Sequence, residues 1–166
     1  MQLSHDEAKL LTGFILSEYE RERPTTVRVL EAVPAGQEDY SPDPKSMGAL
    51  KLAWHIVATE WFLFEGAIQG ALSKPGPQMP DSIHGIPDVV AWYNAHLPAQ
   101  IDKAKSLSGE ALSRLVDFHG KAKIPAYAIL QQMLKHSIHH RGQLSAYLRP
   151  MGGKVPSIYG PSGDSE

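Results

Sequence analysis

The sequence predicts an all-α protein folded as a four-helix bundle. Four segments carry apolar residues at the three- and four-residue spacing of amphipathic helices, and stretches rich in proline and glycine separate them. Only residues 116–118 look extended, so we expect no substantial sheet. A chain of 166 residues is most simply one domain, spanning residues 1–166, with a single core.

The first helix is predicted to begin at Ser4, because Ser4 followed by Glu7 has the spacing of a capping box. Its apolar period continues to about Glu22. Proline is tolerated in a first helical turn, so we expect a short second piece to restart at Pro24 and to end at Pro34.

The second helix is predicted to run from Ser46, a candidate cap, to about Leu72. It follows a loop at residues 35–45, which contain two prolines and a glycine among polar residues. Its aromatic side chains favour burial in the core over a subunit contact; they are Trp54, Trp61, Phe62 and Phe64. Residues 73–87 hold four prolines and two glycines, which predicts a long loop of the kind that often borders a site.

The third helix is expected to begin near Asp88, with a bundle-like apolar seam and a kink at Pro98. Residues 109–115 predict at most a short helical turn, and residues 116–120 look extended and then turned. The fourth long helix is expected to open at Pro125 and to run to Leu148, ahead of a proline and two glycines that stop it.

Two histidines lie on the apolar stripe of this last helix. His136 and His140 are four residues apart, so one ring lies a turn above the other and both can reach one ion. The stripe predicted to face inward consists of Ile129, Met133, His136, His140, Leu144 and Tyr147. His139 lies at its flank and is not expected to be a ligand.

His55 is the best candidate for a third ligand. It shares a helical stripe with Leu52, Thr59 and Phe62, so its ring is expected to face the interior. A buried imidazole needs partners for its nitrogens, and a shared cation would satisfy one nitrogen of each ring. The alternative is three buried histidines bonded to backbone carbonyls, and spacing alone leaves both possibilities open. The remaining histidines are expected to be solvated; they are His5, His84, His96 and His119.

Three imidazoles with an open position are typical of a catalytic zinc site, where bound water has a pKa of about 7 and a bound thiol loses its proton. Such a site would serve a hydrolase, a thiol S-transferase or a thiol-dependent isomerase. Nickel, iron, manganese and copper also accept imidazole ligands. The chain has no cysteine, which excludes a disulfide, a thiolate metal site and a cysteine nucleophile.

No catalytic residue can be assigned from the sequence. Ser137 occupies the position at which a zincin motif places its general base. Glu60 lies roughly 140° around the helix from the candidate ligand of its segment and is poorly placed to reach the ion. Thr59 and Tyr147 could hydrogen-bond a bound ligand, although core packing is favoured for each.

The residues beside the histidine pair allow a supporting role. The amide of Gln143 could orient a ligand or a neighbouring helix. The alternative for Gln143, His139 and Arg141 is helix packing or a dimer contact.

Residues 52–55, LAWH, and residues 136–160, HSIHHRGQLSAYLRPMGGKVPSIYG, together resemble the DinB-like (YfiT-related) family. The resemblance covers nearly the whole chain. It implies an up-down-down-up four-helix bundle, a homodimer, and a divalent metal near one end of the bundle on His55, His136 and His140. The wider superfamily includes mycothiol-dependent maleylpyruvate isomerase and bacillithiol S-transferases. The family name records induction by DNA damage, a stress response, and does not mean DNA binding.

Charge and hydropathy limit the partners and the localisation that can be expected for this chain. The formal net charge is −2 and the basic residues are scattered, which argues against nucleic-acid binding and makes a DNA-binding dimer the weakest hypothesis. No apolar stretch approaches the roughly 20 residues of a membrane span, and the N-terminus does not resemble a leader, so a cytoplasmic protein is expected.

Two functional hypotheses remain. The first is a metal-dependent enzyme that acts on a small-molecule substrate, with a low-molecular-weight thiol as its partner and zinc as the preferred cofactor. The second is a noncatalytic metal-binding stress-response protein.

Overall fold

The structure is a computed structural model that describes residues 3–72, 76–118 and 120–165. Its long helices are α1 (His5–Glu31), α2 (Ala49–Gln69), α3 (Ile86–Ser106) and α5 (Ala126–Leu148). The shorter elements are helix α4 (Gly109–Ser113), strands β1 (Leu115–Phe118) and β2 (Ala122–Pro125), and the 3₁₀ helix η1 (Arg149–Met151). The predicted four-helix bundle is therefore confirmed.

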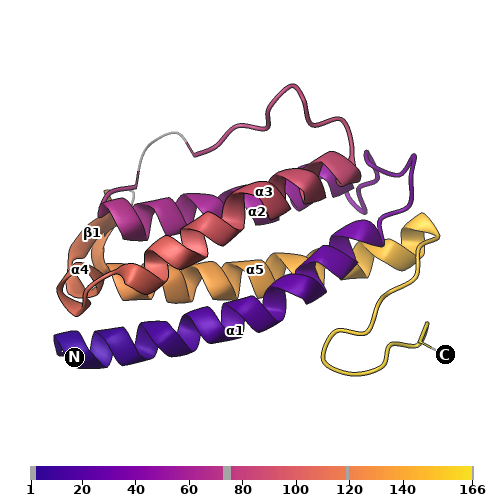
Figure 1. The fold of residues 1–166 in the computed structure, drawn as a ribbon. Coiled ribbons are helices and arrows are strands. Elements are labelled where there is room, and N and C mark those ends of the chain that lie inside the picture. The colour runs from indigo at the N-terminus through magenta and orange to yellow at the C-terminus, as the bar shows by residue number, and fades with distance from the viewer. Residues whose placement is uncertain (1–2, 73–75, 119, 166) are drawn as a thin grey trace.

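The long helices follow the up-down-down-up order. Helices α1 and α5 run in one direction, and α2 and α3 run in the other, because the segment between α2 and α3 crosses back along the bundle (Figure 1). Helix α5 packs between α1 and α2, and α3 packs against both α1 and α2. Apolar side chains from all four long helices form one core. No helix within the described residues is long and apolar enough to cross a membrane.

Helix α1 continues through Pro24, so the predicted break at that residue is wrong. An interior proline removes one helical hydrogen bond and costs about 3 kcal/mol. Burial of Thr25, Thr26, Val29 and Leu30 in the following turns offsets this cost. The Glu22 carbonyl, in the turn that holds Pro24, accepts hydrogen bonds from side chains of Thr26 and Arg141.

Helices α2 and α3 begin and end at residues other than those predicted. Ser46 does not cap α2, because it lies in a turn in which its N–H donates to the Asp43 carbonyl, and Gly48 is the cap. Helix α2 ends before Gly70, which adopts a left-handed conformation with φ of 77° that favours glycine. Helix α3 starts earlier than Asp88, whose carboxylate accepts from the N–H groups of His84 and Gly85. It continues through Pro98.

The described residues contain no sheet larger than one antiparallel hairpin, which agrees with the expectation of no substantial sheet. Residues Leu115–Phe118 are extended, as predicted, but they pair with Ala122–Pro125. The predicted helical turn before the hairpin is present as α4.

Candidate metal centre

Helices α2 and α5 bring the three candidate ligands together. His55 lies in the second turn of α2, and His136 and His140 lie in the middle of α5 rather than near its end. The Nε2 atoms of His55 and His136 are 3.0 Å apart. The ring centroid of His140 is 4.6 Å from that of His55 and 4.3 Å from that of His136. One nitrogen from each ring lies within 4.8 Å of the other two, so the three histidines could hold a metal ion.

Polar neighbours orient two of the three rings. The Nδ1–H of His140 donates to Oε1 of Gln143 over 2.9 Å, and the Gln143 amide donates in turn to the Tyr147 hydroxyl. The Thr59 hydroxyl lies 3.4 Å from Nδ1 of His55. These contacts occupy Nδ1 of each ring and leave Nε2 for a cation, which is the usual arrangement around a metal-bound histidine. The predicted supporting role of Gln143 agrees with this geometry.

The three rings are held in the neutral form that metal binding requires. Burial, followed by the charges of neighbouring imidazoles, lowers the pKa of His136 to about 3. Burial and His140 lower the pKa of His55, and burial is also the main cause of the lowered pKa of His140. At neutral pH each ring therefore offers a lone pair rather than a positive charge.

The donor set fits a divalent cation. Tetrahedral zinc–imidazole bonds of about 2.0 Å place two ligand nitrogens about 3.3 Å apart, close to the 3.0 Å between Nε2 of His55 and Nε2 of His136. Lone pairs on two nitrogens this close repel each other unless a proton or a cation lies between them. Nδ1 of His136 is buried without a hydrogen-bond partner among the described residues, so the one polar contact of this ring there is the one that its Nε2 makes with His55.

A pocket of about 540 Å³ opens beside the histidines. His55 and His136 line it together with apolar side chains of α2. Residues 76–78 of the proline-rich segment and Phe118 of β1 also line it. The expectation that the loop at residues 73–87 borders a site agrees with this lining, although residues 73–75 lie outside the described part of the chain.

The other described histidines are not among the residues that could hold the ion. His139, which was not expected to be a ligand, is exposed, and its ring lies edge-on to that of His140 with centroids 4.7 Å apart. His5, His84 and His96 are exposed, and the ring of His96 stacks on that of Trp92. His119 lies outside the described residues.

The buried stripe of α5 agrees with the predicted one except at its centre; the correctly predicted members are Ile129, Met133, Leu144 and Tyr147. Ser137 and Arg141 lie at its centre and are almost completely buried, whereas His136 and His140 are half-buried toward α2. The i, i+4 pair of histidines therefore borders the core without filling it. With only 1% of its surface exposed inside its own bundle, Arg141 is a packing residue, and the predicted alternative of a dimer contact is wrong for it.

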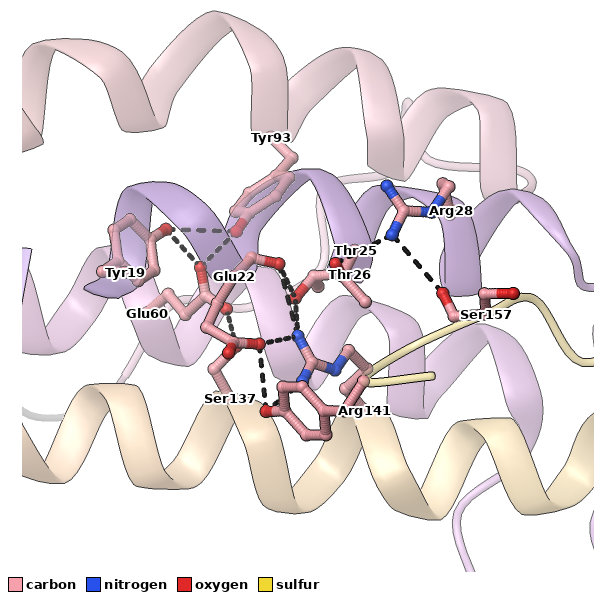
Figure 2. A network of polar contacts seen from close by, with 11 residues as sticks. Tyr19, Glu22, Thr25, Thr26, Arg28, Glu60, Tyr93, Ser137, Arg141 and Ser157 are labelled. Carbon is pink, nitrogen blue, oxygen red and sulfur yellow. Dashed lines mark hydrogen bonds and ion pairs between the residues drawn. The ribbon is translucent and has the colours of Figure 1, made fainter. Parts of the chain in front are cut away.

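Glu60 is the centre of a buried polar cluster that sequence reasoning did not identify (Figure 2). Its side chain is fully buried, and it accepts hydrogen bonds from Tyr19 of α1 over 2.5 Å and from Tyr93 of α3 over 2.6 Å. Ser137 of α5 donates to its other oxygen. Burial raises the pKa of Glu60, and the three hydroxyl donors oppose that rise. One carboxyl group thus joins all four long helices beside the candidate ligand His136.

Arg141 forms a second polar cluster at the next turn of α5. Its guanidinium lies 2.5 Å from the Glu22 carboxylate of α1, and it also donates to the Tyr159 hydroxyl of the C-terminal segment over 2.7 Å. Figure 2 shows this ion pair beside the Glu60 cluster, on the side of α5 that faces α1. The two clusters fix how α5 sits against α1 and α2.

Replacing Gln143 with alanine is expected to weaken metal binding about tenfold, because His140 would lose the acceptor that fixes its ring. Isothermal titration of Zn²⁺ into the two proteins measures the change. Gln131→Ala is a suitable control, since Gln131 is an exposed residue of the same helix that does not line the pocket. Equal affinities for wild type and Gln143→Ala would show that the contact does not position the ligand.

Fold and site together define a class: a four-helix bundle that gathers three histidines from its second and last long helices into a cluster able to hold a metal ion. The chain belongs to the DinB family, whose model matches residues 6–165.

Relatives in Bacillus support this assignment. The chain is 28% identical over 140 residues to YjoA of Bacillus subtilis (strain 168), an uncharacterized protein, with 83% of this chain and 89% of YjoA covered. It is also 28% identical to YrdA of the same organism, with 68% of this chain and 66% of YrdA covered.

Two crystal structures have the same fold. The structure of DinB-like YjoA matches with a TM-score of 0.73 and 24% identity over 89% of this chain and 99% of the other. A DinB-like protein from Bacillus cereus ATCC 10987 matches with a TM-score of 0.72 and 21% identity over 87% and 95% of the two chains.

Proposed function

We propose that this protein is a metal-dependent enzyme that binds a divalent ion, preferably zinc, on His55, His136 and His140 and conjugates a small thiol to an electrophile. The observation that carries the proposal is the convergence of three neutral imidazoles next to an accessible pocket. Three protein ligands and an open position are typical of catalytic rather than structural zinc sites.

The metal, when bound, would supply a positive charge that favours the thiolate form of a thiol at neutral pH. Gln143 and Thr59 hold two ligand rings in position through Nδ1. Apolar side chains of the pocket lie next to His55 and His136 and offer packing surface for the carbon skeleton of a substrate. No carboxylate lies among the candidate ligands, so three neutral imidazoles would leave the positive charge of the ion uncompensated.

The reaction class follows from this arrangement. The sulfur of the thiolate attacks an electrophilic carbon, a C–S bond forms, the bond from that carbon to its leaving group breaks, and the thiol proton passes to solvent. Hydrolysis by an activated water is the related alternative at the same site. We propose the protein as a homodimer, in line with the family resemblance.

A noncatalytic role is the second candidate, and one observation favours it. The three ligands come from two helices far apart in the sequence, so a bound ion would also tie α2 to α5. In that case metal removal would lower the melting temperature strongly, while thiol and ester substrates would remain unconverted.

The test compares metal content with conjugation. Protein purified without a nickel column is subjected to elemental analysis and then assayed with 1-chloro-2,4-dinitrobenzene and a panel of small thiols, following chloride displacement by absorbance. We expect about one divalent ion per chain in the wild type. We expect His55→Ala to lose both the ion and the conjugation above the uncatalysed rate.

His84→Ala is the matched control, because His84 is an exposed histidine that is not among the candidate ligands and does not line the pocket. It is expected to retain both properties. Conjugation that persists in His55→Ala after the metal has been lost would contradict the proposed enzyme.

A further inference from the structure

The pocket beside the histidines has an uneven chemical lining. Apolar side chains form most of its wall, including Met47, Phe62, Leu63 and Phe118. Among the described residues that line it, Lys51 is the one side chain with a full charge, and none is acidic. A ligand that fills this pocket therefore meets an apolar surface and a single cationic group besides any bound metal.

Lys51 has no partner of its own in the described structure. Its ammonium group takes part in none of the ion pairs formed there, and it makes no hydrogen bond. It lies four residues before His55 on α2, so the two side chains are one helical turn apart, with Cβ atoms about 5–6 Å from each other. An unpaired cation one turn from a metal ligand is within reach of the far end of a small molecule bound at the metal.

We infer that the small molecule bound in this pocket is an organic anion, whose carboxylate or similar group pairs with Lys51 while its apolar part packs on the wall and its reactive atom reaches the histidine cluster. This inference rests on the proposed function and names the substrate class of the same site. Neutral and cationic analogues of equal length would lose the ion pair or meet repulsion from Lys51. A partly exposed ion pair contributes up to about 1 kcal/mol, so a preference of about fivefold is expected to depend on Lys51.

The experiment uses three thiols of similar length that differ in charge. They are 3-mercaptopropionate, 3-mercapto-1-propanol and cysteamine, which are anionic, neutral and cationic at neutral pH. Each is titrated into the full chain loaded with Co²⁺, and the visible absorbance of the cobalt reports thiol binding without any turnover. The preference for the anion over the neutral thiol is expected to fall about fivefold in Lys51→Gln and to survive in Lys51→Arg. It is also expected to shrink at 1 M salt.

Lys103→Gln is the matched control, because it removes the same charge from an exposed lysine of α3 that does not line the pocket. It is expected to behave like the wild type. A preference for 3-mercaptopropionate that is unchanged in Lys51→Gln would overturn the inference, since the metal alone would then select the anion. Cobalt binding by each variant and its melting temperature are measured first, so that loss of fold or of metal is seen separately.

The two proposals fail in different ways. If the wild type binds no cobalt and His55→Ala makes no difference, the metal-dependent enzyme is wrong and the substrate class falls with it. If cobalt binds but no thiol changes its spectrum, the pocket does not give access to the ion, which contradicts both. If thiols bind but their order of affinity according to charge does not depend on Lys51, only the inference of an anionic substrate is wrong.

Discussion

Saturating Zn²⁺ is expected to stabilise the wild-type protein by about 4 kcal/mol when the free ion is at a thousand times its dissociation constant. The reason is that the ion binds the folded state, in which His55, His136 and His140 converge, and has no comparable site in the unfolded chain. His136→Ala is expected to remove nearly all of this stabilisation, because it deletes the most buried ligand and leaves two. Urea unfolding with and without Zn²⁺ measures the effect as a difference within each protein, so any cost of the substitution itself cancels.

His84→Ala again serves as the control and is expected to keep the full stabilisation. An equal gain in His136→Ala and wild type would place the ion elsewhere on the chain. Chelation of the wild type should return it to the stability of the metal-free protein.

Glu60→Ala is expected to lower the free energy of unfolding by about 3 to 5 kcal/mol. The substitution removes the acceptor shared by three buried hydroxyls, those of Tyr19, Tyr93 and Ser137, and it leaves a cavity among four helices. The two tyrosine hydroxyls are 3.1 Å apart and can still bond each other, which limits the loss. Urea unfolding at neutral pH measures the change.

Glu31→Ala is a suitable control for Glu60→Ala, because Glu31 is exposed near the end of α1 and is expected to change stability by less than about 0.5 kcal/mol. If Glu60→Ala lowered the free energy of unfolding by as little as Glu31→Ala does, the buried carboxyl group would contribute no net stability.

Glu60 is also expected to give the stability a distinct pH dependence. Burial raises its pKa above the ordinary value of 4.5, so the folded protein binds a proton more tightly than the unfolded chain does. The stability gained from this difference is complete below pH 4.5 and is lost as the pH rises through the higher pKa of the folded state. Glu60→Gln cannot titrate, so wild type should lose stability relative to Glu60→Gln over this range. A difference that is constant with pH would contradict the raised pKa.

The bundle could be predicted from local spacing, and the three candidate ligands could be predicted from spacing together with the family resemblance. Apolar residues at helical intervals mark each long helix, and the four-residue step between His136 and His140 places both rings on one side of α5. His55 could be added because its helical neighbours Leu52 and Phe62 are apolar, and both are buried.

The buried polar clusters could not be predicted in the same way. Glu60 takes its hydrogen bonds from three other helices, and no spacing within α2 indicates where Tyr19 or Tyr93 will lie. The available signal was a lone carboxylate in an otherwise apolar stretch, residues 56–64, apart from a threonine. The centre of the predicted α5 stripe is wrong, because Ser137 and Arg141 lie there instead of histidines, although both ends of the stripe are buried as predicted. The break predicted at Pro24 is wrong because local sequence does not show the packing that stabilises a proline-containing helix. That packing comes from the rest of the fold.

The C-terminal segment has a consequence for how the chain is made. Glu22 and Tyr159 are 137 residues apart in sequence, yet both contact the guanidinium of Arg141. Arg141 is translated 119 residues after Glu22, and closure of such distant contacts is slow. In the nascent protein, Glu22 therefore stays without its cationic partner until α5 has been made.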